Sequence, residues 1–208
     1  MTTSCNWSNR TVWTGDNLPV MRGMNSETVD LIYLDPPFNS KANYAAPIGS
    51  KAAGAEFKDT WSLSDVDAEW INLIEAKHPA LYRVLMAAMT DSDKSYLAYM
   101  AARLLEMRRV LKPSGSIYLH CDPTMSHYLK LLMDAIFGRV AFGSEVIWKR
   151  QSSHNRAKRW GPIHDCILYY VGGGGGAADM EPRPAAARPG LHQAILPALR
   201  RTRSVHGG

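Results

Sequence analysis

The hydrophobic positions of this chain form short apolar runs and longer segments with helical spacing. Runs typical of strands occur at Val29–Leu34, Ser116–His120, Glu145–Trp148 and Asp165–Val171, with a shorter strand-like piece at Arg10–Trp13. Helical spacing of apolar residues is found at Leu18–Met24, Ala80–Met89, Lys94–Leu111 and Met125–Phe137, and a further helical pattern begins at Asp65. The chain therefore contains both strands and helices.

The order of these segments predicts a layered α/β fold. Helical segments separate most of the strands, and this alternation is typical of a mostly parallel sheet with helices packed on it. Only a polar loop separates Glu145–Trp148 from Asp165–Val171, so we expect these last two strands to form an antiparallel edge. Residues 39–64 are polar and weakly patterned, and we expect a long loop over the site there.

The character of the sequence changes after residue 171. Gly172–Gly176 are five consecutive glycines, and residues 177–208 are rich in Ala, Pro and Arg. We therefore predict one domain over residues 1–171 and a flexible tail over residues 172–208. The tail has five arginines against Asp179 and Glu181, so it contributes +3 of the net charge of +5.

Charge and cysteine usage narrow the classes of function. A net charge of +5 permits a polyanionic partner such as nucleic acid. Cys5, Cys121 and Cys166 are widely spaced and favour neither a disulfide framework nor a zinc site, so we expect no metal and a reducing cytoplasm. No leader pattern stands at the N-terminus, and no apolar run approaches the ~20 residues of a membrane span. We expect a cytoplasmic protein with no membrane partner.

The most informative stretch follows Val29–Leu34 and reads Asp35-Pro36-Pro37-Phe38. Two prolines cannot continue a sheet ladder and each fixes its own φ, so the chain leaves the strand as a stiff loop with few N–H donors. Asp35 then lies at the carboxyl end of a strand, where open α/β sheets build their sites. A carboxylate, backbone carbonyls and a flat aromatic ring suit a planar ring that carries an exocyclic amine.

This loop resembles the catalytic loop of the DNA amino-methyltransferases, which methylate adenine N6 or cytosine N4 with S-adenosyl-L-methionine (SAM). The resemblance implies a Rossmann-like fold, as in other SAM-dependent methyltransferases, and a catalytic role for Asp35, Pro36, Pro37 and Phe38. Asp35 and the Pro36 carbonyl would accept the amine hydrogens of a base flipped out of the duplex, Phe38 would stack on its ring, and Asn39 would also contact the substrate. An Asp at the first loop position favours adenine, because cytosine-N4 members more often have Ser there.

A second resemblance covers residues 148–165, which are similar to a stretch in the adenine-specific branch of the family. Its cations and the adjacent aromatic ring can hold DNA phosphates and support an extruded nucleotide. We expect contacts with double-stranded DNA from Lys149, Arg150, Arg156, Lys158, Arg159 and Trp160. The alternative is a solvated basic loop between two edge strands.

Three further acidic or basic side chains have candidate roles. Thr14-Gly15-Asp16-Asn17 is similar to the Gly-Asp that precedes the catalytic loop in the family, so Asp16 is expected to bind the cofactor together with Asp35; a plain Asx turn is a compatible interpretation. Asp122 could line the pocket or cap the next helix, and we favour the cap. His120 is not expected to act as a base, because no nucleophilic side chain has to be activated.

The resemblance covers roughly residues 10–171. Members of the family whose catalytic loop comes first hold SAM with a later Phe-x-Gly-x-Gly loop, and residues 172–208 contain no such sequence. We therefore expect an incomplete fold that contains a truncated catalytic half. Alone, this half should bind SAM weakly and transfer no methyl group. The expected partners besides DNA are a complementary SAM-binding fragment and a restriction endonuclease.

Other classes of function are also open. The chain could belong to a cytosine-N4 methyltransferase, or to one that acts on RNA or protein through a similar loop, and methylation assays on duplex DNA and RNA would separate these from an adenine enzyme. A catalytically dead DNA-binding remnant is a further alternative, which calorimetric titration with SAM would test.

Overall fold

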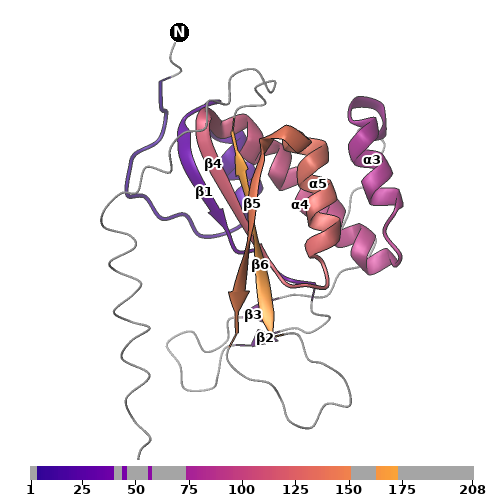
Figure 1. The fold of residues 1–208 in the computed structure, drawn as a ribbon. Helices are drawn as coiled ribbons and strands as arrows, with labels where there is room; N and C mark the ends of the chain where they lie inside the picture. Colours follow the sequence, from indigo (N-terminus) through magenta and orange to yellow (C-terminus); the bar gives the residue numbers. More distant parts are fainter. Residues whose placement is uncertain (1–3, 40–43, 46–55, 58–73, 151–162, 173–208) are drawn as a thin grey trace, which may run out of the picture. The chain divides into compact units, whose positions relative to one another are not determined.

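The computed structural model describes residues 4–39, 44–45, 56–57, 74–150 and 163–172. Within these ranges a four-stranded sheet has the order β1-β4-β6-β5 (Figure 1). Its strands are β1 (Val29–Leu34), β4 (Leu111–Cys121), β5 (Phe142–Lys149) and β6 (His164–Val171). A separate antiparallel pair is formed by β2 (Tyr44–Ala45) and β3 (Glu56–Phe57).

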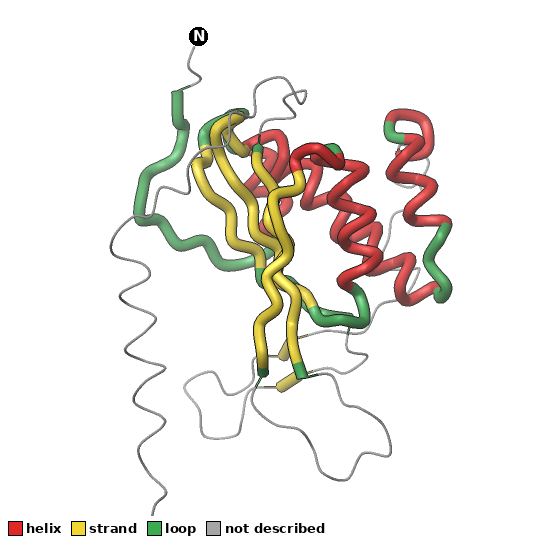
Figure 2. Tube along the Cα trace, in the orientation of Figure 1, coloured by secondary structure: helices red, strands yellow, loops and turns green. Residues whose placement is uncertain are grey.

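Helices cover one face of the four-stranded sheet, as the red and yellow segments of Figure 2 show. They are α1 (Asn17–Gly23), α3 (Pro79–Met86), α4 (Asp91–Val110), α5 (Ser126–Phe137) and the 3-10 turn η2 (Arg139–Ala141). The longest of them, α4, begins where the Thr90 hydroxyl accepts a hydrogen bond from the Asp93 N–H, a typical N-cap. Leu97 and Leu104 of α4 are buried in one core with Ile117 and Leu119 of β4.

The predicted α/β class and the antiparallel edge are confirmed. β5 and β6 pair in antiparallel fashion, and β1 spans the residues predicted for it. The described sheet is mixed rather than mostly parallel, because β1 with β4 is its parallel pair while β6 runs antiparallel to both of its neighbours. The prediction of a strand at Arg10–Trp13 is wrong, since Arg10 lies in a turn with a φ of 61° and residues 11–13 form no strand among the described residues. The tail beyond Gly172 and most of the loop at 39–64 lie outside the described ranges.

The second face of the sheet carries exposed apolar side chains in the part of the chain that the structure describes. Leu31 and Tyr33 of β1 and Val146 and Trp148 of β5 are all exposed. Although Val29–Leu34 is an apolar run, the described strand is not buried on both faces. The alternation instead places Ile32 and Leu34 toward the core and their neighbours in β1 toward solvent.

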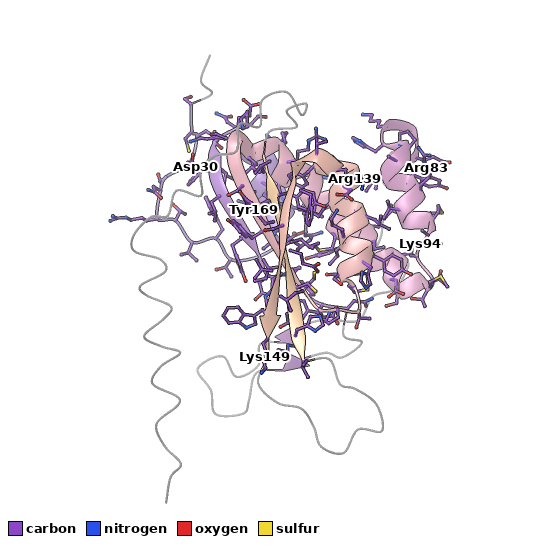
Figure 3. The ribbon with its side chains drawn as sticks, viewed as in Figure 1. Asp30, Arg83, Lys94, Arg139, Lys149 and Tyr169 are labelled. Atoms are coloured by element: carbon purple, nitrogen blue, oxygen red, sulfur yellow. The ribbon has the colours of Figure 1, made fainter. Side chains whose placement is uncertain are left out.

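The strand directions bring distant parts of the sequence to one edge of the sheet. β1, β4 and β5 all run in one direction, and β6 runs in the opposite direction. The carboxyl ends of β1, β4 and β5 therefore lie at the same edge of the sheet as the amino end of β6. Figure 3 shows Lys149 at this edge and Asp30, at the start of β1, at the opposite end of the sheet. No helix within the described ranges is long and apolar enough to cross a membrane.

Candidate active site

The loop after β1 presents a carboxylate at the carboxyl edge of the sheet. β1 ends at Leu34, and residues 35–39 continue without regular structure, as the two prolines predicted. The Asp35 side chain is 60% exposed, whereas Pro36 is buried and Phe38 is half-buried. The loop is therefore held against the protein while its carboxylate faces solvent.

Asn39 fixes the far end of this loop to the start of α4. Its φ of 58° lies in the left-handed region, which Asn tolerates better than most residues. Its Nδ2 donates to Asp93 Oδ1 at 2.8 Å, and the Ser92 hydroxyl donates to Asn39 Oδ1 at 3.1 Å. The side chain is buried, so the structure gives Asn39 an anchoring role, and its contact with substrate stays a prediction.

His120 of β4 lies beside the Asp35 carboxylate. Its Nδ1 is 3.2 Å from Asp35 Oδ1, and its Nε2 is 3.3 Å from Asp165 Oδ2. The Phe38 ring meets the imidazole in an edge-to-face arrangement, with the ring centroids 5.2 Å apart. One side chain therefore lies against both the carboxylate and the aromatic ring of the loop after β1.

Asp165 is a buried carboxylate at the start of β6. Arg150, just beyond β5, donates from Nε to Asp165 Oδ2 at 2.7 Å. A buried charge needs a partner, and this guanidinium supplies one. Two atoms here still have no hydrogen-bond partner among the described residues, namely His120 Nε2 and Asp165 Oδ1. The approaches of His120 Nδ1 to Asp35 Oδ1 and of Nε2 to Asp165 Oδ2 are thus both close contacts without hydrogen-bond geometry.

The predicted DNA-contacting residues divide into two groups. Lys149 is exposed at the end of β5, and Arg150 follows it with its Nε directed at Asp165. Four further residues lie outside the described ranges, and these are Arg156, Lys158, Arg159 and Trp160. The structure therefore places the beginning of the basic stretch at the same sheet edge as Asp35.

Asp16, the candidate cofactor residue, is already engaged by protein groups. Its Oδ1 accepts the Leu18 N–H as the N-cap of α1, and it also forms an ion pair with Arg103 Nη2 at 2.8 Å. The hydrogen bond from Leu18 and the charge of Arg103 hold the pKa of Asp16 below its ordinary value. The Asx turn is thus present. The Asp16 side chain is still 54% exposed, so its expected contact with the cofactor stays a prediction, as does that of Asp35.

The ion pair of Asp16 gives a pH-dependent prediction. Asn caps helices as well as Asp does, so Asp16→Asn removes the charge and keeps the cap. We expect it to lower the free energy of unfolding by about 0.5–1 kcal/mol at pH 7, the usual worth of a partly exposed pair. A carboxyl with a lowered pKa stabilises the fold above its ordinary pKa of 3.8, and this contribution is lost as the pH falls through the lowered pKa. Urea titrations at pH 7 and pH 3 measure the difference in free energy of unfolding between the wild type and Asp16→Asn. The same difference at both pH values would contradict the ion-pair role.

Asp122 has a cap-like hydrogen bond in the turn before α5, whereas the N-cap residue of α5 itself is Met125 and has no side-chain cap. Asp122 Oδ1 accepts the Met125 N–H at 3.0 Å, in the turn that leads into α5 at Ser126. Among the residues with described positions, no group of three or more His, Cys, Asp or Glu side chains could hold a metal ion.

The sequence interpretation missed the role of Asp165 and the contact between His120 and Asp35. His120 and Asp165 are polar residues beside apolar ones in β4 and β6, near the strand ends that form the candidate edge. A buried charged residue at such a place usually has a partner or a function. That signal was available, but it could not show which side chains meet.

Comparisons with known proteins identify similar sequences. Residues 29–176 match the sequence family described as DNA methylase (N6_N4_Mtase). The Type III restriction-modification enzyme StyLTI Mod subunit of Salmonella typhimurium is 31% identical over 174 residues, which are 81% of this chain and 25% of that protein. The DNA adenine methyltransferase YhdJ of Escherichia coli is 24% identical over 163 residues, which are 78% of this chain and 41% of that protein.

Among solved structures, PvuII DNA methyltransferase (cytosine-N4-specific) aligns with 77% of this chain and 48% of its own, at 12% identity and a TM-score of 0.43. The chain thus spans a quarter of the length of the StyLTI Mod subunit and less than half of the other two proteins.

Proposed function

We propose that this chain, which belongs to the DNA methylase family, carries the amine-binding part of a SAM-dependent DNA adenine-N6 methyltransferase. The observation that carries the proposal is the exposed Asp35 carboxylate, held at the carboxyl edge of the sheet beside the half-buried Phe38 ring. A carboxylate only accepts hydrogen bonds, so this pair suits a flat base with an exocyclic amino group.

In this proposal the chain binds a base flipped out of the duplex, which costs a few kcal/mol of unstacking. Asp35 and the Pro36 carbonyl accept the two amine hydrogens and orient the nitrogen lone pair, while Phe38 stacks on the ring. SAM, when bound, supplies the methyl group. The contribution of the described residues is positioning, which can account for a large share of catalysis when two reactants are held in line.

Adenine is the favoured target base. Asp35 stands at the loop position where cytosine-N4 members more often have Ser, and the similar YhdJ protein is described as a DNA adenine methyltransferase. Cytosine N4 is the alternative within the same chemistry, because its amino group presents the same two hydrogens to a carboxylate.

The proposed partners follow from the charge of the chain and from its relatives. Double-stranded DNA suits the exposed Lys149 and the basic stretch that follows it. The chain contains no Phe-x-Gly-x-Gly sequence, so we propose that a polypeptide with that loop completes the SAM site. The StyLTI relative is named a subunit of a restriction-modification enzyme, which supports a restriction endonuclease as a partner, in the cytoplasm where the DNA lies.

Nucleoside analysis tests the proposed function. Purified chain, with and without a complementary SAM-binding polypeptide, is incubated with SAM and genomic DNA that lacks modified bases, and the digested nucleosides are identified by mass spectrometry. We expect N6-methyladenine in the complemented reaction. N4-methylcytosine would overturn the choice of base, methylation of RNA alone would overturn the substrate, and no methylated product in any mixture would leave DNA binding as the function.

The basic stretch gives a prediction for DNA binding. Lys149→Gln should weaken binding to all duplexes alike and reduce the slope of log K against log salt by about one, because one phosphate contact is lost. Lys112→Gln is the matched control, since Lys112 pairs with Asp30 at the opposite end of the sheet and its loss should leave the slope unchanged. Fluorescence anisotropy over a salt series measures both. A change of sequence preference at constant slope would instead indicate base recognition by Lys149.

A further inference from the structure

Four charged or titratable side chains form a row along the carboxyl edge of the sheet. Asp35 follows β1, His120 is the next-to-last residue of β4, Asp165 is the second residue of β6, and Arg150 follows β5. Their contacts run in the same order as the strands: Asp35 to His120 at 3.2 Å, His120 to Asp165 at 3.3 Å, and Asp165 to Arg150 at 2.7 Å. The row thus connects the catalytic loop with the start of the basic stretch.

We propose that His120 is the positioning residue of the catalytic loop, which holds Asp35 through Nδ1 and Phe38 through its ring. The proposal rests on the amine-binding role proposed above for these two residues. His120 itself does not touch the base. It sets the direction of the carboxylate and the tilt of the aromatic ring, and these must fit one planar base at the same time.

The gradient of exposure along the row supports this role. The Asp35 side chain is 60% exposed, His120 is 18% exposed and Asp165 is 6% exposed. A side chain as exposed as Asp35, in a loop, exchanges freely between rotamers. A fixed partner selects one of them, and His120 is fixed because it stands on a central strand and its far nitrogen faces a buried carboxylate.

The charges that face His120 are the two carboxylates of Asp35 and Asp165, with the Arg150 guanidinium bound to Asp165. Arg150 offsets the buried charge of Asp165, so that Asp165 can remain beside the imidazole without a second cation. His120 Nε2 and Asp165 Oδ1 are nevertheless buried without a hydrogen bond among the described residues. Groups with a purely structural role are normally satisfied, and such exceptions are more typical of functional sites.

The contacts can be tested on the full 208-residue chain by NMR of its 15N-labelled histidine rings. The His120 signals are those that disappear in His120→Gln. Asp35→Asn should shift the Nδ1 signal more than the Nε2 signal, and Asp165→Asn should do the reverse. Asp30→Asn is the matched control, because Asp30 is an exposed carboxylate at the other end of β1. Ring signals that respond to Asp35→Asn no more than to Asp30→Asn would overturn the proposal.

The functional consequence is tested with a pair of variants that both lose the imidazole. The amide nitrogen of Asn occupies about the place of Nδ1, and that of Gln about the place of Nε2. In the complemented methyl-transfer reaction, we expect the kcat of His120→Gln to be about tenfold below that of His120→Asn, because misplacement of a reacting group costs at least this much. The KM for DNA and the thermal unfolding temperature should be similar in the two variants.

The outcomes separate this proposal from the proposed function. Equal kcat values for the two variants, or a difference that lies in KM alone, would overturn the positioning role while methylation by the wild type upholds the function. If the wild type produces no methylated nucleoside, the proposed function fails, and the response of the His120 signals to Asp35→Asn still decides whether His120 holds the loop.

Discussion

Replacing Asp35 by alanine is expected to reduce methyl transfer by more than the ~10²–10³-fold that is typical of removing one oriented electrostatic partner. The carboxylate accepts the amine hydrogens in the proposed complex, so its loss removes both the electrostatic stabilisation and the orientation of the nitrogen. Its side chain is mostly exposed and lies beyond the end of β1. The free energy of unfolding should therefore change little.

The measurement is single-turnover methyl transfer in the complemented reaction, together with SAM titration and thermal unfolding of the same samples. Asp30→Ala is the matched control, because Asp30 is an exposed carboxylate on the same strand that pairs with Lys112 away from the candidate edge. We expect normal turnover in the control and almost none in Asp35→Ala, with SAM affinity nearly intact in both. Turnover of Asp35→Ala near the wild-type rate would remove Asp35 from the site.

Replacing Phe38 by alanine should lower methyl transfer by about 5- to 150-fold, which corresponds to the ~1–3 kcal/mol usually carried by one base–aromatic stack. Phe38→Tyr and Phe38→Trp should retain much of the activity, because they keep an aromatic face. The edge-to-face contact with His120 favours one orientation of the Phe38 ring.

Phe142→Ala is the control for Phe38, because Phe142 packs its ring against Tyr170 and below the Lys130 ammonium group, away from the catalytic loop. We expect Phe142→Ala to lower the unfolding temperature with little effect on turnover of the folded fraction, and Phe38→Ala to show the opposite pattern. Should Phe38→Ala mainly reduce stability while turnover is preserved, Phe38 is a packing residue and the stacking role is wrong.

Local sequence signals determined much of the fold that holds these residues. The bounds of β1 follow from an apolar run and from two prolines that cannot continue a ladder. α4 was recognised from its helical spacing, although its start at Asp91 depends on the Thr90 cap, which the spacing does not reveal. The antiparallel edge followed from the absence of a helix between the last two strands. These features depend on neighbours in the chain, and such neighbours are visible in one sequence.

Features that depend on partners far away in the sequence were predicted less well. Arg10–Trp13 has the composition of a strand but forms no ladder in the described part of the chain, since a strand is stabilised by pairing rather than by propensity alone. The hydrogen bonds of Asn39 to Ser92 and Asp93 at the start of α4 were not foreseen, and its expected contact with substrate stays a prediction. In both cases the partner, or its absence, is set by the fold.

The sequence by itself determined where β1 ends and the candidate catalytic loop begins, because the strand, the prolines and the aromatic ring of that loop are adjacent in the chain. Only the tertiary structure decided that His120 stands between Asp35 and Asp165, and that Arg150 completes this row. That arrangement requires β4 to pair with β1 on one side and β6 on the other, in one particular register. Register is set by the burial of Ile117, Leu119 and Leu168 on the helix side of the sheet, and a slip of one residue would turn His120 to the opposite face.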